Sequence, residues 1–283
     1  MTRRRVVLTG AGGTIAGGLL PYLRERYDLL PLDVRETDRQ GRPIVGVRVV
    51  DLLAADRTAV REAFRGADAV VHCGFVRSAR ADDPVARLWA ELENVRMAAN
   101  VYLAAWEEEV RRVVVASSNH AADYYEDLIL DGEMDVVTPE TKTASYGFYG
   151  WAKEAYEDLG FTLAVGRELG RPLENVQVRI GAPRETDLDR CAPGDLRCMR
   201  RALGAYLSQR DMASLFIRAI ETEDIRDEHG VPYAIVYGVS DNPHAFWSIA
   251  NARRRLGYRP EDSSEVRFHE RVGEFIRAAR GGH

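Results

Sequence analysis

The sequence predicts an α/β fold, a doubly wound parallel sheet followed by a small C-terminal lobe. Three observations predict it. Short apolar runs alternate with longer amphipathic stretches over the first 180 residues, the first run passes into a glycine turn, and two later runs are apolar throughout. Strands that are buried on both faces have this continuous apolar character, as in Ala69-Val-Val-His-Cys73 and Val113-Val-Val-Ala116.

The expected strands and helices alternate along the chain. Strands are expected at Val6–Thr9, Leu29–Asp33, Ile44–Asp51, Ala69–Cys73, Val113–Ser117 and Val176–Ile180, and helices at Ile15–Arg26, Ala59–Phe64, Pro84–Trp106 and Tyr149–Glu168. After a loop over Gly181–Cys198 we expect helices at Arg200–Tyr206, Asp211–Ile220 and Ser248–Leu256 and a strand at Tyr233–Tyr237. No proline-rich or glycine-rich linker divides the chain, so residues 1–283 are predicted to form a single domain, with a core at about 1–180 and a lobe at about 181–283. The terminal Gly-Gly-His is expected to be disordered.

Composition excludes several classes of protein. A chain of 283 residues, 46% hydrophobic and 29% charged, can bury a full core. Its net charge of -5 gives no electrostatic reason to expect nucleic acid or an anionic membrane as a partner. No apolar run approaches the ~18 residues of a membrane span. We therefore expect a cytoplasmic protein with no membrane partner.

The cysteines and histidines predict neither a disulfide framework nor a metal site. Cys73, Cys191 and Cys198 are few and odd in number, and although Cys191 and Cys198 are close enough in sequence to pair, we expect both to be free. The six histidines include no His-x-His and no His-Glu-x-x-His spacing, so no bound metal is predicted.

The N-terminal glycine turn predicts a dinucleotide site. An apolar run ending at Thr9 leads into Gly10-Ala-Gly-Gly-Thr-Ile-Ala-Gly17, and the following leucines have helical spacing. Glycines let the backbone close on a pyrophosphate, which the free amides and the dipole of the helix N-terminus favour. The second apolar run ends in Asp33, about 20 residues beyond the turn, where a carboxylate accepts the ribose hydroxyls and repels a 2'-phosphate. This favours NAD over NADP, although Arg35 leaves NADP open.

Tyr149 and Lys153 predict proton transfer. Only two of the 39 lysines and arginines are lysines, Lys142 and Lys153. An ammonium four residues after a tyrosine lies on the same helix face, where its field favours the phenolate, so that the tyrosine can exchange a proton near neutral pH. An isolated pair of this kind is more often a surface lysine near a half-buried tyrosine. Here the dinucleotide turn favours the catalytic interpretation.

Ligands of such sheets bind beyond the carboxyl ends of the strands, which places the candidate residues along one edge. Together with the catalytic pair, the cofactor-binding candidates are Gly10, Gly12, Gly13, Thr14, Ile15, Asp33, Asp51, Leu52, Cys73, Gly74, Asn94, Ser117 and Ile180. Ser117, Ser118, Asn119 and His120 would face the nicotinamide end. The core would then hold the cofactor and the lobe would cover the substrate.

These motifs together resemble the extended short-chain dehydrogenase/reductase superfamily, which includes the NAD-dependent epimerases and dehydratases and has a Rossmann-like fold. One departure is that the third glycine, expected at Ala16, stands at Gly17. Within the superfamily the chain is similar to the uronate dehydrogenases and the haloarchaeal NAD-dependent glucose-6-phosphate dehydrogenases. The segments that carry this resemblance are Ala116-Ser-Ser-Asn-His120, Val178-Arg-Ile-Gly181, Val236-Tyr-Gly-Val-Ser-Asp-Asn242, Trp247 and Leu256-Gly-Tyr-Arg-Pro260.

The resemblance implies NAD-dependent oxidation of a sugar or uronic acid at C1 to a lactone. Tyr149 would be the base, Lys153 would lower its pKa and bind the nicotinamide ribose, and Ser118 would bond the reacting oxygen. Asn119 and His120 would hold sugar hydroxyls, Ser78 is an approximate match to a substrate serine, and Arg201 matches a carboxylate-binding arginine. Arg179 is expected to be structural.

Two alternatives remain open at this point: a nucleotide-sugar epimerase or dehydratase that retains its NAD, and a dinucleotide-sensing regulator. The chain also looks longer than the uronate dehydrogenase pattern at three places on the ligand edge, after Gly74, between His120 and Tyr146, and between Arg184 and Met199, so substrate identity transfers less well than cofactor chemistry. By analogy with the superfamily we expect a homodimer formed through helices Pro84–Trp106 and Tyr149–Glu168.

Overall fold

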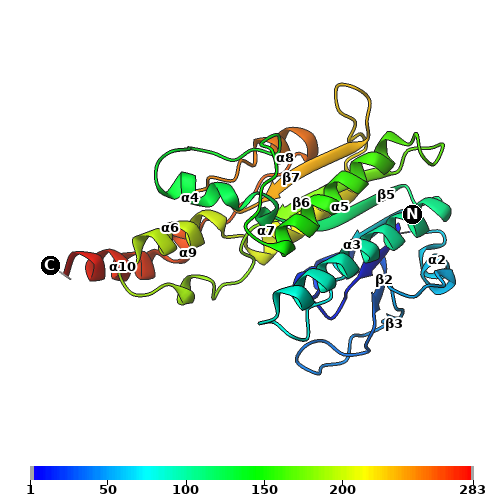
Figure 1. Ribbon diagram of the computed structural model, residues 1–283, viewed down its shortest axis with the longest axis horizontal. Helices are drawn as coiled ribbons and strands as arrows, with labels where there is room; N and C mark the ends of the chain where they lie inside the picture. Colours follow the sequence, from blue (N-terminus) through cyan, green and yellow to red (C-terminus); the bar gives the residue numbers. More distant parts are fainter. Residues whose placement is uncertain (1–2, 282–283) are drawn as a thin grey trace.

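A seven-stranded sheet forms the centre of the computed structural model, which describes residues 3–281 (Figure 1). The strand order is β3-β2-β1-β4-β5-β6-β7, and every neighbouring pair is parallel. The strands are β1 Arg5–Thr9, β2 Asp28–Asp33, β3 Arg48–Val49, β4 Ala69–His72, β5 Arg112–Ser118, β6 Glu174–Ile180 and β7 Tyr233–Gly238. The chain thus winds outward from β1 in one direction and from β4 in the other, which confirms the predicted doubly wound α/β fold.

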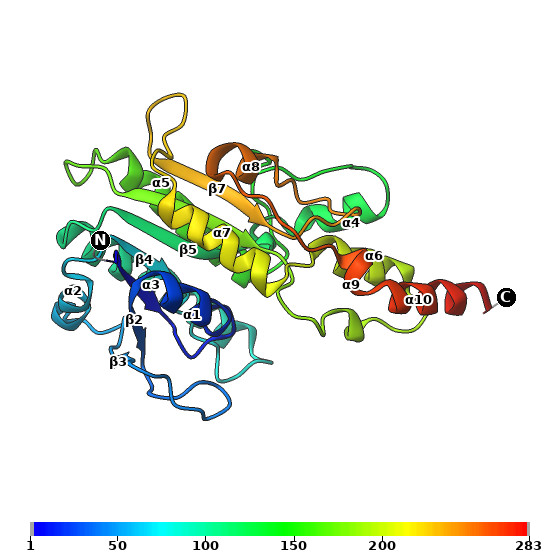
Figure 2. The same ribbon diagram turned by 180° about the vertical axis from the view of Figure 1, so that it is seen from behind.

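Helices cover both faces of the sheet. Two of them, α1 (Thr14–Arg26) and α7 (Gln209–Glu221), pack on one face and are seen in Figure 2. Helices α2 (Thr58–Phe64), α3 (Pro84–Glu107) and α5 (Phe148–Val165) pack on the other. The remaining helices are α4 (Tyr124–Leu130), α6 (Leu196–Ala205), α8 (Ala250–Leu256), α9 (Ser264–Arg267) and α10 (His269–Gly281), with short 3-10 turns at Asn119–Ala122 and Leu188–Arg190.

Local chemistry explains where the helices beside the site begin and end. The Asp83 side chain caps α3 by accepting hydrogen bonds from the amides of Val85 and Ala86, and Pro84 occupies the first turn, where no amide donor is needed. Helix α5 ends at Gly166, whose φ of 76° favours glycine. The predicted helix to Glu168 is therefore three residues too long, and the strand predicted over Ile44–Asp51 is reduced to the two residues of β3 that pair with β2.

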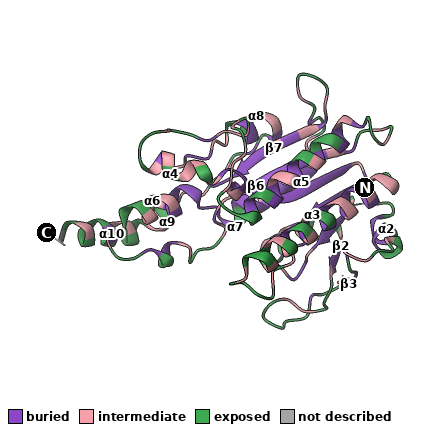
Figure 3. Cartoon of the chain, viewed as in Figure 1, coloured by how far each residue is buried: buried purple, intermediate pink, exposed green. Residues whose placement is uncertain are grey.

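The C-terminal lobe has its own apolar clusters but shares elements with the sheet. Figure 3 shows the strands buried between the two helix layers. Trp247 and Phe246 are buried in a cluster that also contains Ala122, Ile129 and Val137, which precede residue 181. Residues after 180 therefore contribute both to this lobe and, through β7 and α7, to the sheet layers.

Several features of the lobe differ from the sequence prediction. Cys191 and Cys198 form a disulfide, which corrects the expectation that both are free, while Cys73 is free. Helices α4, α9 and α10 were not predicted. Of the terminal Gly-Gly-His that was predicted to be disordered, Gly281 is the last residue of α10, and Gly282 and His283 lie outside the described range. Within that range, no helix is both long and apolar enough to span a membrane.

Candidate active site

The glycine turn between β1 and α1 forms a cradle that side chains would fill. Gly10 has a φ of 69°, and a Cβ on it would lie 2.7 Å from the carbonyl oxygen of Cys73. A Cβ on Gly12 would lie 3.3 Å from Asp33 Oδ2. Helix α1 begins at Thr14 without a side-chain cap, so its first amides face the cleft free for a ligand. This arrangement fits the pyrophosphate of a dinucleotide.

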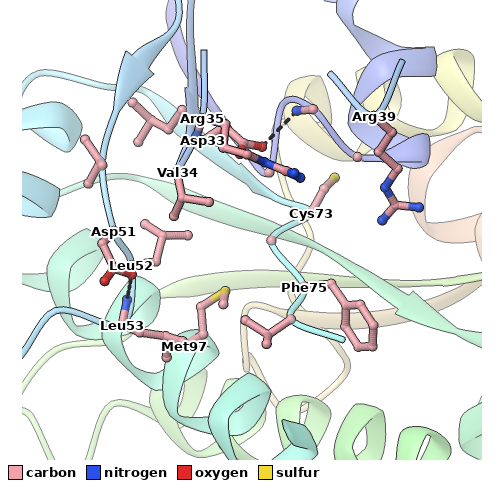
Figure 4. A pocket seen from close by; sticks show the side chains of 17 residues that line it. Asp33, Val34, Arg35, Arg39, Asp51, Leu52, Leu53, Cys73, Phe75 and Met97 are labelled. Atoms are coloured by element: carbon pink, nitrogen blue, oxygen red, sulfur yellow. Dashed lines mark hydrogen bonds between the residues drawn. The ribbon is translucent and has the colours of Figure 1, made fainter. Parts of the chain in front are cut away.

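Asp33 lies at the rim of the cavity beside this cradle (Figure 4). Its carboxylate accepts hydrogen bonds from the amides of Gly12 at 2.9 Å and Arg35 at 3.2 Å, which fix its orientation. Asp51, which lines the same cavity, accepts a bond from the amide of Leu53 at 2.8 Å. The other predicted cofactor residues that line the cavity are Gly10, Gly13, Leu52, Cys73 and Gly74.

A second cavity of about 450 Å³ adjoins the first and contains the predicted catalytic residues. It lies beyond the carboxyl ends of β1, β4, β5 and β6, as expected for a doubly wound sheet. Its volume falls within the range of ligand pockets. Of the predicted residues it is lined by Gly13, Thr14, Ile15, Cys73, Ser117, Ser118, His120, Tyr149, Lys153 and Ile180.

Lys153 is buried beneath this second cavity and is held by few polar contacts. Its Nζ donates a hydrogen bond to the carbonyl oxygen of Ala116 at 3.0 Å. The same nitrogen lies 4.4 Å from the ring centre of Tyr156 and 5.5 Å from that of Tyr149. Burial lowers its pKa to about 8, against the opposing field of Glu91.

Tyr149 lies at the wall of the same cavity. Its ring meets those of Phe75 and His120 edge to face, with centres 5.5 and 5.6 Å apart. Although Tyr149 is 36% exposed, desolvation by the surrounding protein raises its pKa, whereas the neighbouring Ser118 hydroxyl lowers it. The protein alone thus does not produce the lowered pKa that the sequence analysis expected from Lys153.

Ser117 and Arg179 belong to a buried network behind the catalytic residues. The Ser117 hydroxyl donates to Glu157 Oε1 at 2.7 Å. Arg179 donates to both oxygens of Glu157, at 2.9 and 2.6 Å, and to the hydroxyl of Tyr237. The charge of Glu157 is therefore neutralised, and Arg179 has the structural contacts that were predicted for it.

At the end of β5 and just after it, some polar side chains reach the cavity and others point into the protein interior. Ser118 Oγ accepts a bond from the amide of His120, and His120 Nδ1 lies 2.8 Å from Asp123 Oδ2. Asn119 is buried, and its amide nitrogen faces Glu126 at 3.5 Å. His120 thus reaches the cavity, whereas Asn119 contacts protein groups.

Three other predicted residues lie outside the cavity that holds Tyr149 and Lys153. Arg201 donates two hydrogen bonds to Glu126, at 2.9 and 3.0 Å. Ser78 lines an outer cavity on the far side of Tyr149, and its hydroxyl bonds the main chain of Arg80. Asn94 bonds the amide and carbonyl of Val76, and so holds the loop after β4 instead of facing the cofactor cleft.

The structure adds cavity residues that the sequence analysis did not select. Arg39, Arg77 and Arg184 line the cavity with Tyr149, and so does the carboxylate of Glu91 from α3. Because arginine is common throughout this chain, no pattern in the sequence distinguishes these three. Two polar residues at helical spacing, Glu91 and Asn94, on a helix face whose other buried residues are mostly apolar were a usable signal. Among residues 3–281 no cluster of three or more histidine, cysteine or acidic side chains is placed to hold a metal ion.

The model of the NAD dependent epimerase/dehydratase family matches residues 6–162, from β1 into α5. This match covers more than half of the chain and includes the glycine cradle and the Tyr149–Lys153 pair. The chain belongs to this family. The predicted superfamily and Rossmann-like fold are thereby confirmed.

Several proteins similar to this chain are sugar dehydrogenases. The chain is 32% identical to the uronate dehydrogenase of Pseudomonas syringae pv. tomato, over 93% of this chain and 83% of that protein. It is also 32% identical to the NAD-dependent glucose-6-phosphate dehydrogenase of Haloferax volcanii, over 92% and 94%. The structure of uronate dehydrogenase from Agrobacterium tumefaciens superposes with a TM-score of 0.73 at 25% identity, covering 97% of this chain and 90% of that one. These matches confirm NAD as the cofactor and an oxidoreductase as the class of enzyme.

Proposed function

We propose that the protein oxidises a cyclic sugar or sugar acid at C1 and releases the lactone. The observation that carries the proposal is one cavity in which Ser118, Tyr149 and Lys153 meet the glycine turn. NAD+, when bound, accepts the hydride from C1. Tyr149 takes the proton of the C1 hydroxyl, and Ser118 donates a hydrogen bond to the same oxygen as it becomes a carbonyl.

Lys153 has two tasks in this proposal. Its ammonium favours the phenolate of Tyr149, and it would donate a hydrogen bond to the nicotinamide ribose of a bound cofactor. Because burial and the charge of Glu91 raise the pKa of Tyr149, ionisation of the base near neutral pH requires positive charge in the cleft. Lys153 supplies one such positive charge. Arg77 and Arg184 also line the cavity, and their charges lower the pKa of Tyr149.

An acidic sugar suits the cavity better than a neutral one. Arg77 and Arg184 line it. In the described part of the chain Arg77 has no carboxylate within 4.0 Å, and Arg184 forms only a loose pair with Asp187, at 3.6 Å. Arg201, which the resemblance suggested as the carboxylate ligand, is already bonded to Glu126. We therefore assign recognition of a carboxylate or phosphate on the substrate to Arg77 and Arg184 before Arg201.

The test is a panel of uronic acids, aldoses and sugar phosphates mixed with the protein and NAD+. We expect NADH absorbance to grow with an acidic sugar, and NMR of the product to show a lactone. Conversion of a nucleotide sugar without NADH would support the epimerase alternative, and binding of NAD without any turnover over the whole panel would support the regulator.

We also propose a homodimer, formed through α3 and α5. These helices pack side by side, and large apolar side chains remain exposed on them, including Val85 at 61% and Trp89 at 64% on α3 and Phe161 on α5. Sedimentation equilibrium should then give twice the mass of the chain, and Trp89→Glu should give the monomer. A wild-type protein that sediments as a monomer would contradict this.

A further inference from the structure

Two buried carboxylates lie near Lys153, and only one of them is neutralised. Glu157, on the same helix, forms a bidentate ion pair with Arg179 at 2.6 Å and accepts a hydrogen bond from Ser117. Its negative charge is therefore balanced within the protein. The second carboxylate, Glu91, comes from the neighbouring helix α3.

Glu91 is exposed by only 8%, and it lines the cavity of Tyr149 and Lys153. Its Oε2 accepts a hydrogen bond from Asn94 at 3.0 Å. Within residues 3–281 no arginine or lysine nitrogen lies within 4.0 Å of it. Burial raises the pKa of Glu91, whereas the bond from Asn94 and the charge of Lys153 lower it. A charge buried without a direct ion-pair partner is costly, so its position calls for an explanation.

Lys153 is exposed by only 4% and needs a counter-charge for the same reason. Its one hydrogen bond, to the carbonyl of Ala116, leaves two ammonium protons without a protein acceptor in the described part of the chain. The rings of Phe75, Tyr149 and Tyr156 surround the nitrogen at 4.4 to 5.6 Å from their centres. Aromatic faces attract a cation, but they do not cancel its charge.

The other titratable groups around Lys153 do not supply that counter-charge. Burial raises the pKa of the Cys73 thiol to about 12 and lowers the pKa of His72 to about 3, so both are neutral at working pH. Burial also raises the pKa of Tyr156. Arg39, Arg77 and Arg184 line the cavity with positive charge. Glu91 is therefore the unneutralised negative group that faces Lys153 in the described structure.

We propose that Glu91 keeps Lys153 protonated and thereby acts as a positioning residue for the Tyr149–Lys153 pair. The carboxylate of Glu91 and the ammonium of Lys153 do not form a contact ion pair. They interact electrostatically across the cavity, and in a partly desolvated space such an interaction is effective over several ångströms. The consequence for catalysis rests on the proposed function. The charge state of Lys153 does not, because it is a property of the protein without cofactor.

The direction of the effect follows from the sign of the charge. Lys153 is active as the ammonium, which exists below its pKa, and removal of Glu91 lowers that pKa, so the ammonium is lost at a lower pH. Glu91 also raises the pKa of Tyr149, so its removal lets the phenolate form at a lower pH. Both limbs of the pH profile of kcat/KM should therefore move toward acid in Glu91→Gln. A merely structural role would lower the profile without moving it.

The chain offers a direct measurement, because it has only two lysines. Protein labelled with 13C-lysine and kept free of cofactor gives two Cε signals, and exposed Lys142 serves as the internal reference. We expect Lys153 to titrate near pH 8 in the wild type and roughly one pH unit lower in Glu91→Gln, with Lys142 unchanged. Glu93→Gln is the matched control, since it removes the same charge two residues away, where Glu93 pairs with Arg96 on the exposed face.

An unchanged Lys153 titration in Glu91→Gln, or an equal shift in Glu93→Gln, would overturn the proposal. Should Glu91→Gln fail to fold, Glu91→Met removes the same charge with a side chain suited to burial, and the same shift is expected. Since the titration needs no substrate, its failure is distinguishable from failure of the proposed dehydrogenase activity: a wild type that turns over no sugar leaves the expected Lys153 shift intact.

Discussion

The cofactor side and the substrate side of the cleft are built in different ways. On the cofactor side, the candidate ligand groups are main-chain amides and short side chains at the ends of β1, β2 and β4, such as Gly12 and Asp33. On the proposed substrate side, the candidate groups are long side chains after β6, such as Arg184 on a loop and Arg201 on α6. Main-chain groups are positioned by turns that a sequence motif specifies. Long side chains are positioned by partners that lie elsewhere in the sequence, as Glu126 lies 75 residues from Arg201.

The largest effect is expected where the two sides meet, at Tyr149. Tyr149→Phe removes the proposed base and leaves the ring contacts with Phe75 and His120. We expect kcat to fall by about 10²- to 10⁴-fold while the dissociation constant for NAD, measured by fluorescence quenching, stays within a factor of about two. Tyr146→Phe is the control, because the Tyr146 hydroxyl bonds Asp127 outside the catalytic cavity. Full turnover in Tyr149→Phe would exclude the mechanism.

The next largest effect tests whether the cofactor side depends on backbone shape. In Gly10→Ala a Cβ would meet the carbonyl of Cys73 at 2.7 Å in a left-handed conformation. We expect a loss of stability of about 3 kcal/mol and weaker NAD binding. Gly41→Ala has a similar φ of 77° with no atom within 4 Å of the added Cβ, so it should cost only about 1 kcal/mol. Equal melting temperatures for the two variants would show that the close approach to Cys73 is unimportant.

The sheet could be predicted from the sequence because its signals are local. Continuous apolar runs and the glycine turn placed β1, β2, β4, β5 and β6 to within about two residues at each end. The failures have physical reasons. Helix α10 (His269–Gly281) is rich in charge, and among its described side chains Phe275 is the one buried apolar residue. Helix α4 lies in a segment whose apolar residues, such as Ile129 and Val137, pack in the lobe cluster around Trp247 and not in the main core under the sheet helices.

The site was predictable to the same extent. Ser118 and Lys153 lie together in the cavity. Their positions follow from local structure, since Ser118 ends a strand and Lys153 lies one helical turn after Tyr149. Residues whose role depends on a free side chain do not follow from local sequence. Arg201 and Asn119 contact Glu126, and Asn94 is bonded to the loop after β4. Sequence spacing does not predict these hydrogen-bond partners, because side chains far apart in the sequence are brought together only in the folded protein.

The disulfide gives a smaller effect confined to the substrate side. Cys191 and Cys198 are seven residues apart, and closing a loop of that length in the unfolded chain stabilises the fold by about 2 kcal/mol. Reducing agent should therefore lower the midpoint of urea unfolding and raise KM for the sugar more than KM for NAD. The variant with alanine at both positions should be insensitive to the reductant. If the reductant changes the unfolding midpoint and KM of that variant equally, the effect comes from Cys73 and not from the disulfide.

The smallest effect separates the two roles open to Arg201. Its pair with Glu126 is partly shielded, at 29% and 15% side-chain exposure, so a double-mutant cycle with Arg201→Met and Glu126→Gln should give a coupling of about 1 kcal/mol in unfolding free energy. If the pair is structural, Arg201→Met changes KM for acidic and neutral sugars alike, whereas Arg184→Met raises KM for the acidic sugar alone. A selective loss of acidic substrate in Arg201→Met would instead mean that substrate displaces Glu126. Arg201 would then have to leave its partner Glu126 before it binds a ligand. The main-chain amides on the cofactor side need no such exchange.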